Sequence, residues 1–191
     1  MKKLITGRWS LAAFILLLLL SCNGEQANQQ TTTTQGEANT EMATDDQQLV
    51  EERLRRFDSL DFQFYNNQDW DSFAISHADN IKVFYPDGTI TEGLYPEHID
   101  MLTPLFAFAP DTKIKEHPIS FGTGDWTTVV GEMEGTFTKP MKMPDGKTIP
   151  PTGKKFKLRM CTVAKWDGGK IVEEHLFWDN LAMMKQIGVV Q

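Results

Sequence analysis

Residues 155–180 read KFKLRMCTVAKWDGGKIVEEHLFWDN, and this stretch decides the fold. Apolar and basic side chains alternate over 155–166, which predicts a strand with one buried and one exposed face. Asp167-Gly168-Gly169 is a strong hairpin signal, and 170–178 then returns as a second long strand. The side chains expected on the inner face are Phe156, Leu158, Met160, Thr162, Ala164 and Trp166, and those expected outside are Lys155, Lys157, Arg159 and Lys165.

The strand expected before this hairpin, 126–138, has the same two-sided pattern. Val129, Met133 and Phe137 share one face, and Glu132 and Glu134 lie on the other. We expect this strand to pair with 155–166, so that the two glutamates meet Lys157 and Arg159 on the outer face. Such exposed cross-strand pairs contribute roughly 0.2–1 kcal/mol each. They are typical of surface structure and do not indicate a functional site.

Helical patterns dominate the chain before these strands. Apolar residues recur at helical spacing over 47–66, and shorter helices are expected at 70–77 and 95–108. The remaining expected elements are strands at 81–85, 89–92 and 113–120 and a closing helix at 180–186. Helices first and an antiparallel meander later predict an α+β domain.

The first 22 residues resemble the signal of a bacterial lipoprotein. Lys2, Lys3 and Arg8 precede an apolar run at 11–20, which is too short to span a membrane, and a small residue stands before Cys22. The resemblance implies removal of a signal peptide, 1–21, and acylation of Cys22 with fatty acids such as palmitate. The protein would then be anchored in the cell envelope outside the cytoplasm, with the bacterial outer membrane favoured. The alternatives are an uncleaved anchor and an ordinary secretory peptide.

The composition separates a polar linker from one folded domain. Residues 22–46 hold almost no apolar side chain, which predicts a flexible tether, and 47–191 remain as a single domain. The chain has 26 acidic and 19 basic residues, and without 1–21 the balance is 26 to 16, a net charge of −10. This charge argues against a nucleic-acid partner. With Cys22 acylated, Cys161 has no partner for an intramolecular disulfide.

A series of short motifs resembles the SnoaL-like polyketide cyclase group, which is part of the nuclear transport factor 2-like superfamily. The resemblance covers about 50–188, and the order of the pieces is more specific than any one of them. The motifs are Tyr85-Pro86-Asp87-Gly88, Ala109-Pro110-Asp111, Gly124-Asp125, Glu134-Gly135-Thr136-Phe137, Pro150-Pro151-Thr152-Gly153-Lys154, DGGKIVEE at 167–174, Phe177-Trp178-Asp179 and Gln186-Ile187-Gly188.

The resemblance implies a fold, a pocket and a type of chemistry. It implies a cone-shaped domain in which a curved antiparallel sheet packs on N-terminal helices and encloses an apolar pocket, and it implies a homodimer. Cyclases of this group close a ring by an intramolecular aldol step without a metal or organic cofactor. Asp179 matches the acid/base aspartate of the group. The sequence departs from the group at His175, where a large aromatic residue is usual, and at the insertion 139–149.

Asp179 and His175 are the candidate catalytic residues. A carboxylate in an apolar pocket can remove a proton next to a carbonyl group. Asp179 also stands where it would cap the helix that follows, which is the structural alternative. His175 has the same strand parity as Asp179 and could contact the other end of a ligand. Its alternative is a histidine packed in the sheet and bonded to Glu173 or to a carbonyl group.

The other candidate positions concern the ligand and metals. We expect no metal site, because His77, His98 and His117 lie in different predicted elements without the spacing of metal ligands. The resemblance implies that no organic cofactor is needed either. Aromatic and apolar side chains that could line a pocket are Tyr65, Trp70, Tyr85, Met101, Trp126 and Phe177.

Two functions remain open. The first is a membrane-tethered domain that binds, and cyclises or isomerises, a small apolar carbonyl compound. The second is a non-catalytic ligand-binding or protein-interaction domain on the same anchor.

Overall fold

The computed structural model describes residues 30–190, and side chains are described from 45 onward. The predicted signal peptide and Cys22 lie outside the described residues. The chain divides into two compact units between Asn39 and Thr40, and the second unit carries the sheet and the core. Within 30–190, no helix has both the length and the apolar character that a membrane crossing requires.

The first helix is longer than the sequence pattern predicts. Helix α1 covers Gln30–Ser59 and continues as a π-helical segment, η1, over Leu60–Tyr65. Residues 30–46 of the expected tether are therefore helical. They contain no proline, and extending a helix that already has a stable nucleus costs little compared with starting one.

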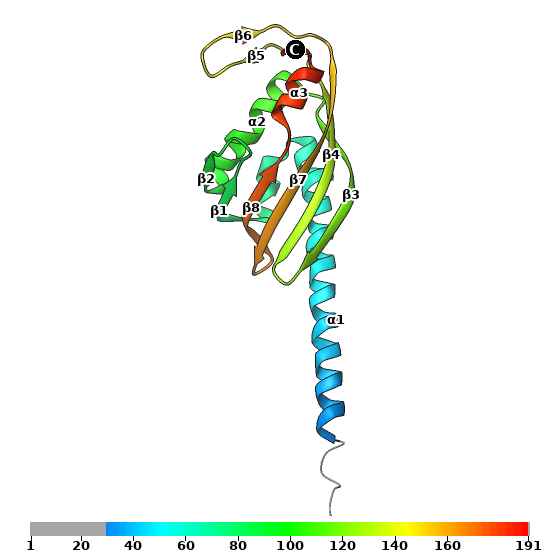
Figure 1. The fold of residues 1–191 in the computed structure, drawn as a ribbon. Coiled ribbons are helices and arrows are strands. Elements are labelled where there is room, and N and C mark those ends of the chain that lie inside the picture. The colour runs from blue at the N-terminus through cyan, green and yellow to red at the C-terminus, as the bar shows by residue number, and fades with distance from the viewer. Residues whose placement is uncertain (1–29, 191) are drawn as a thin grey trace, which may run out of the picture. The chain divides into compact units, whose positions relative to one another are not determined.

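The remaining elements follow the predicted order (Figure 1). A short hairpin falls within the 139–149 insertion. The helical elements are η2 (Trp70–Ile75), η3 (Leu94–His98), α2 (Ile99–Phe108) and α3 (Asn180–Gln186). The strands are β1 (His77–Phe84), β2 (Ile90–Glu92), β3 (Lys113–Thr123), β4 (Trp126–Thr136), β5 (Met141–Lys142), β6 (Thr148–Ile149), β7 (Lys155–Asp167) and β8 (Lys170–Phe177).

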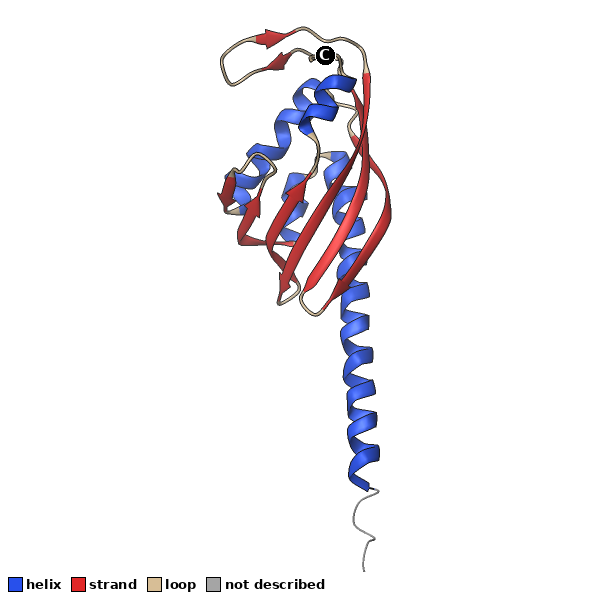
Figure 2. Ribbon diagram, in the orientation of Figure 1, coloured by secondary structure: helices blue, strands red, loops and turns tan. Residues whose placement is uncertain are grey.

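Six strands form one curved sheet in the order β2-β1-β8-β7-β4-β3 (Figure 2). The expected α+β fold is confirmed. One detail of the prediction is wrong, because β1 pairs with β8 in parallel while the other neighbours pair antiparallel. The core lies between the sheet and the helices, and Phe137, Phe156 and Trp166 are almost fully buried there.

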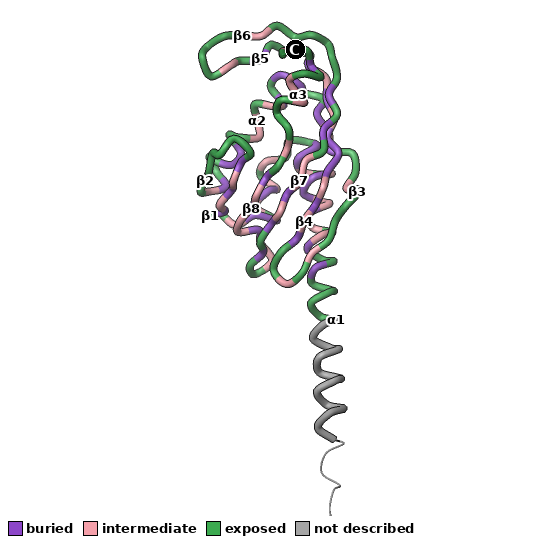
Figure 3. Tube along the Cα trace, viewed as in Figure 1, coloured by how far each residue is buried: buried purple, intermediate pink, exposed green. Residues whose placement is uncertain are grey.

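The predicted pairing of β4 with β7 is confirmed. Glu132 lies opposite Arg159, and Glu134 lies opposite Lys157. Arg159 donates two hydrogen bonds to Glu132, and Lys157 forms a second ion pair with it. Burial alternates along most of these strands (Figure 3), but Glu132 is only 8% exposed, because the side chains of Lys157 and Arg159 bond to it, so the expected exposure of this residue is wrong.

The β7–β8 hairpin has a bulge that decides which side chains of β8 face the core. Gly168 and Gly169 both have positive φ, as a two-residue type I′ turn requires. A regular hairpin on this turn would place His175 opposite Thr162, but the register shifts by one residue and Leu176 takes that place. A shift of one residue exchanges the two faces of a strand. Glu174 is therefore buried opposite Ala164, and His175 lies on the outer face.

Candidate functional site

A cavity of about 170 Å³ lies between the sheet and the helices. Its walls are mainly apolar, and the side chains that carry charge or can gain it are Asp61, His77, His98 and Glu174. The apolar part includes Phe57, Leu60, Phe108, Ile114, Met133 and Leu176. A cavity of about 150 Å³ accommodates a benzene molecule, so this one has room for a small ring compound.

The π-helical segment η1 brings an acid and a phenol to the same wall. Asp61 and Tyr65 are four residues apart on it, both are buried and both line the cavity. Neighbours at this spacing lie on the same side of a helix. π-Helical turns are rare and occur often at functional sites.

Asp61 is held by a buried histidine. His117 Nε2 lies 2.9 Å from Asp61 Oδ2, and its Nδ1 lies 2.7 Å from Asp58 Oδ1. The His117 side chain is 4% exposed and that of Asp58 is 49% exposed, so the three groups connect the cavity wall with the surface. The His117 ring stacks on Phe62.

The surroundings shift the pKa of both members of this pair upward. Burial raises the pKa of Asp61, against the lowering effect of its hydrogen bond to His117. Burial lowers the pKa of His117, but its bonds to Asp61 and Asp58 more than offset this, and the net shift is upward. His117 is thus favoured as an imidazolium, and Asp61 is a stronger base than an ordinary aspartate.

Tyr65 offers a hydroxyl group to the cavity. Its hydroxyl donates to Met133 Sδ at 3.7 Å, and a thioether is a weak acceptor. Burial raises the pKa of this phenol, so it stays protonated. A ligand oxygen could therefore replace the sulfur as the acceptor at small cost.

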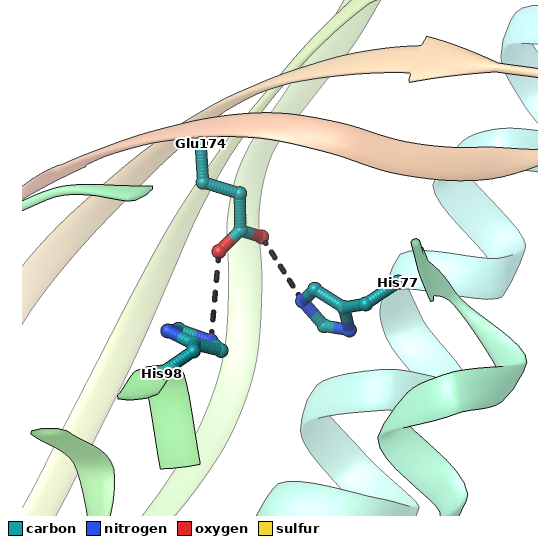
Figure 4. A group of neighbouring side chains, drawn as sticks. All are labelled: His77, His98 and Glu174. Carbon is teal, nitrogen blue, oxygen red and sulfur yellow. Dashed lines mark ion pairs between the residues drawn. The ribbon is translucent and has the colours of Figure 1, made fainter. Parts of the chain in front are cut away.

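His77, His98 and Glu174 form a second polar group in the cavity wall (Figure 4). His77 Nε2 lies 3.5 Å from Glu174 Oε1, and His98 Nε2 lies 3.9 Å from Glu174 Oε2. All three side chains are at most 4% exposed. They come from β1, η3 and β8, so only the folded chain brings them together.

The protein also engages the other ring nitrogen of each histidine. His77 Nδ1 lies 3.1 Å from the carbonyl oxygen of Phe73, and His98 Nδ1 lies 2.7 Å from the hydroxyl of Tyr85. The carbonyl can only accept, so the bond at Nδ1 needs a proton on that atom, and His77 Nε2 faces the carboxylate. Burial lowers the pKa of His98 to about 4, although Glu174 opposes this shift, so His98 is neutral near pH 7.

The structure places the two predicted catalytic residues outside the cavity wall. Asp179 is exposed, and its Oδ1 accepts a hydrogen bond from Ala182 N at 2.8 Å, which is a helix cap for α3. His175 bonds to Glu173 at 2.8 Å and stacks on Phe84. Both positions match the structural alternatives, and the expected placement of these side chains in a pocket is wrong, because the bulge reverses the strand parity.

The predicted ligand-lining residues divide into three groups. Tyr65 and Met101 line the cavity. Trp70 packs edge-on against Tyr65, and Tyr85 reaches the site only through its bond to His98. The last two, Trp126 and Phe177, are exposed residues of the sheet.

Sequence reasoning missed the polar residues of the cavity for different reasons. Asp61 follows Phe57 by four residues and thus lies on the apolar side of the first helix, a signal that was available. Regular strand alternation places Glu174 on the outer face, and the bulge in β8 moves it to the inner one. His77 and His98 were judged by their spacing along the chain, which says nothing about residues that a fold brings together.

Comparisons with known proteins agree with this architecture. A comparison with curated proteins finds no match. Among solved structures, a protein described as a SnoaL-like polyketide cyclase from Jannaschia aligns with TM-score 0.63 and 19% identity, covering 74% of this chain and 95% of that one. IdmH, described as a polyketide cyclase of Streptomyces antibioticus, aligns with TM-score 0.61 and 21% identity, covering 71% and 98%.

A more distant structure has the same fold. A protein from Catenulispora acidiphila with a ketosteroid isomerase-like fold aligns with TM-score 0.53 and 12% identity, covering 66% of this chain and 88% of that one. At these identities the likeness establishes the fold alone. The sequence profile of the SnoaL-like polyketide cyclases matches residues 57–187, most of the chain. The chain therefore belongs to the SnoaL-like polyketide cyclase family.

Proposed function

We propose that this protein binds a small, mostly apolar carbonyl compound in the cavity and transfers a proton on it through Asp61. The observation that carries the proposal is a buried carboxyl group in an apolar wall, with a raised pKa and a phenol on the same helical turn. A fold of this kind serves several activities, so the argument rests on these side chains.

The chemistry follows from the two groups on η1. The Asp61 carboxylate takes a proton from the carbon next to the carbonyl group, and negative charge moves to the carbonyl oxygen. Tyr65 donates a hydrogen bond to that oxygen, which stabilises charge that is absent from the ground state. The enolate can then attack a second carbonyl of the same molecule, which closes a ring, and the alkoxide that forms takes the proton back from Asp61. If the compound is a β,γ-unsaturated carbonyl, the dienolate instead takes this proton from Asp61 at its γ-carbon, which isomerises it. His117 keeps the carboxylate in place.

The second candidate function is a domain that binds without catalysis and pairs through its sheet. The outer face of the sheet exposes apolar side chains, and Phe121 and Phe177 are 59% and 54% exposed. Their cross-strand neighbours are Thr128, opposite Phe121, and Cys161, opposite Phe177. We propose this face as the contact of a homodimer, which would cover it in either function.

We also propose that the domain is attached to the bacterial cell envelope through acylated Cys22. The support is the signal-like sequence of the first 22 residues. Metabolic labelling with a fatty acid analogue tests it. We expect label on the wild-type chain and none on Cys22→Ser, while Cys161→Ser remains labelled. Labelling of Cys22→Ser at the wild-type level would refute the anchor.

Mass spectrometry of small molecules that co-purify with the full chain tests the ligand. We expect wild type and Asp61→Asn to retain a carbonyl compound, with unconverted substrate enriched in the variant. Asp179→Asn, which alters a carboxyl group outside the cavity, should resemble wild type. The same compound, unchanged and equally abundant in all three proteins, would favour the binding function over catalysis.

A further inference from the structure

We infer that His77, His98 and Glu174 form a binding site for one divalent transition-metal ion, such as Zn²⁺ or Fe²⁺, in the wall of the cavity. One donor atom of each residue lies within 4.8 Å of the others. This inference departs from the expectation of a metal-free protein, and it does not depend on the proposed reaction.

The donor set and its spacing fit such an ion. Two imidazole nitrogens and a carboxylate oxygen are the ligands of several zinc sites and of the iron sites with two histidines and one carboxylate. Metal bonds of about 2.1 Å in tetrahedral geometry separate donor atoms by about 3.4 Å. The distance from His77 Nε2 to Glu174 Oε1 is 3.5 Å, and that from His98 Nε2 to Glu174 Oε2 is 3.9 Å. All donor atoms lie within 4.8 Å of one another, so side-chain movements of about 1 Å bring them to this spacing.

The outer hydrogen bonds supply an independent argument. Histidines that bind a metal usually donate the proton of their other ring nitrogen to a protein acceptor, which fixes the ring and the tautomer. Here His77 Nδ1 faces the carbonyl of Phe73, and His98 Nδ1 faces the hydroxyl of Tyr85. Both Nε2 atoms are then turned toward one carboxylate, as Figure 4 shows.

The negative charge of Glu174 also favours binding of a cation. Glu174 is 3% exposed, and the ion pairs it makes among the described residues are with these two histidines alone. A buried carboxylate is costly unless its charge is compensated. A divalent ion would neutralise it and bind both imidazoles. Because all three residues line the cavity, a further coordination position would be open to water or to a ligand oxygen.

Cobalt is a suitable probe, because protein-bound Co²⁺ absorbs visible light and replaces zinc in sites of this kind. The full chain, in detergent and without a histidine tag, is stripped with a chelator and titrated with Co²⁺ and then with Zn²⁺. We expect one Co²⁺ per chain, displaced by one Zn²⁺, and a rise in melting temperature with the metal. No uptake by wild type at micromolar Co²⁺ would overturn the inference.

Variants connect this uptake with the three residues. Glu174→Gln and His98→Gln should lose tight binding, and Tyr85→Phe, which removes only the outer partner of His98, should weaken it about 10- to 100-fold. His175→Gln is the matched control, because His175 also bonds to a glutamate but lies outside the cavity wall. It should bind as wild type does.

The Tyr85→Phe variant keeps the test valid if Glu174→Gln or His98→Gln fails to fold. Circular dichroism shows which variants fold, and Tyr85→Phe leaves all three metal ligands in place. If folded His98→Gln and Tyr85→Phe both bind Co²⁺ with wild-type affinity, the site is refuted. The titration uses neither ligand nor turnover, so its failure leaves the proton-transfer proposal untouched, and the failure of that proposal leaves the metal site untouched.

Discussion

The coupling energy between His117 and Asp61 tests how strongly this buried ion pair stabilises the cavity wall. The two side chains are 4% and 12% exposed, and their nearest atoms are 2.9 Å apart. Coulomb's law with an effective dielectric constant of about 20 gives about 6 kcal/mol as an upper limit. The loss of solvation reduces this value, and coupling energies of contacting residues lie at about 0.5–3 kcal/mol. We expect a coupling of about 2 kcal/mol near pH 6.

A double-mutant cycle measures this coupling. The free energy of unfolding is obtained by urea titration for wild type, His117→Gln, Asp61→Asn and the double variant. Asp58→Asn in the same cycle is the control, because this carboxylate bonds to the same ring at 2.7 Å but is half exposed. Solvent screening should reduce its coupling below about 1 kcal/mol. Equal couplings for Asp58 and Asp61 would refute the argument from burial.

The raised pKa values predict how the stabilisation by this pair changes with pH. The pKa of His117 is raised above its usual 6.5. The folded state therefore holds the proton more tightly than the unfolded state, and the stabilisation is complete below about pH 6.5 and is lost as pH rises through the folded pKa. The pKa of Asp61 is also raised, so its ionisation likewise lowers stability as pH rises above about 3.8. The coupling should be clearly smaller near pH 9. A coupling that stays constant or rises between pH 6 and pH 9 would contradict the assignment of His117 as a protonated partner of Asp61.

Three further predictions concern the cap, the cavity and the outer face. Asp179→Ala should lower the free energy of unfolding by about 1 kcal/mol, through loss of the cap to α3, without changing ligand retention; urea titration and mass spectrometry check both. Leu102→Trp should fill the cavity and abolish co-purification of the small molecule, while Ala107→Trp, an exposed position of the same helix, should not. Phe177→Lys should shift the chain from dimer to monomer in sedimentation, and a variant with unchanged mass would exclude this face as the contact.

The fold could be predicted well because its signals are local. Alternation over 155–166 and the Asp167-Gly168-Gly169 turn define the central hairpin, and the predicted pairing of Glu132 with Arg159 is present. The parallel contact of β1 with β8 was missed because the strands are far apart in the sequence. The helical start of α1 at Gln30 was missed because polar composition indicates a lack of core contacts and says less about helix formation.

The site was predicted less well because it depends on register. One bulged residue in β8 buries Glu174 and turns His175 outward, and strand parity gives no warning of it. Asp179 was chosen by family resemblance, and the structure gives it a cap. The cluster of His77, His98 and Glu174 forms only when three elements pack together.

Exchange of carbon-bound protons tests the central claim most directly. Small cyclic ketones are incubated with the protein in D₂O, and NMR follows loss of the protons next to the carbonyl group. We predict exchange by wild type and by Asp179→Asn, and a rate lower by about 10²- to 10⁴-fold for Asp61→Asn. Wild-type exchange in Asp61→Asn, or its loss in Asp179→Asn, would contradict the assignment of Asp61 as the base.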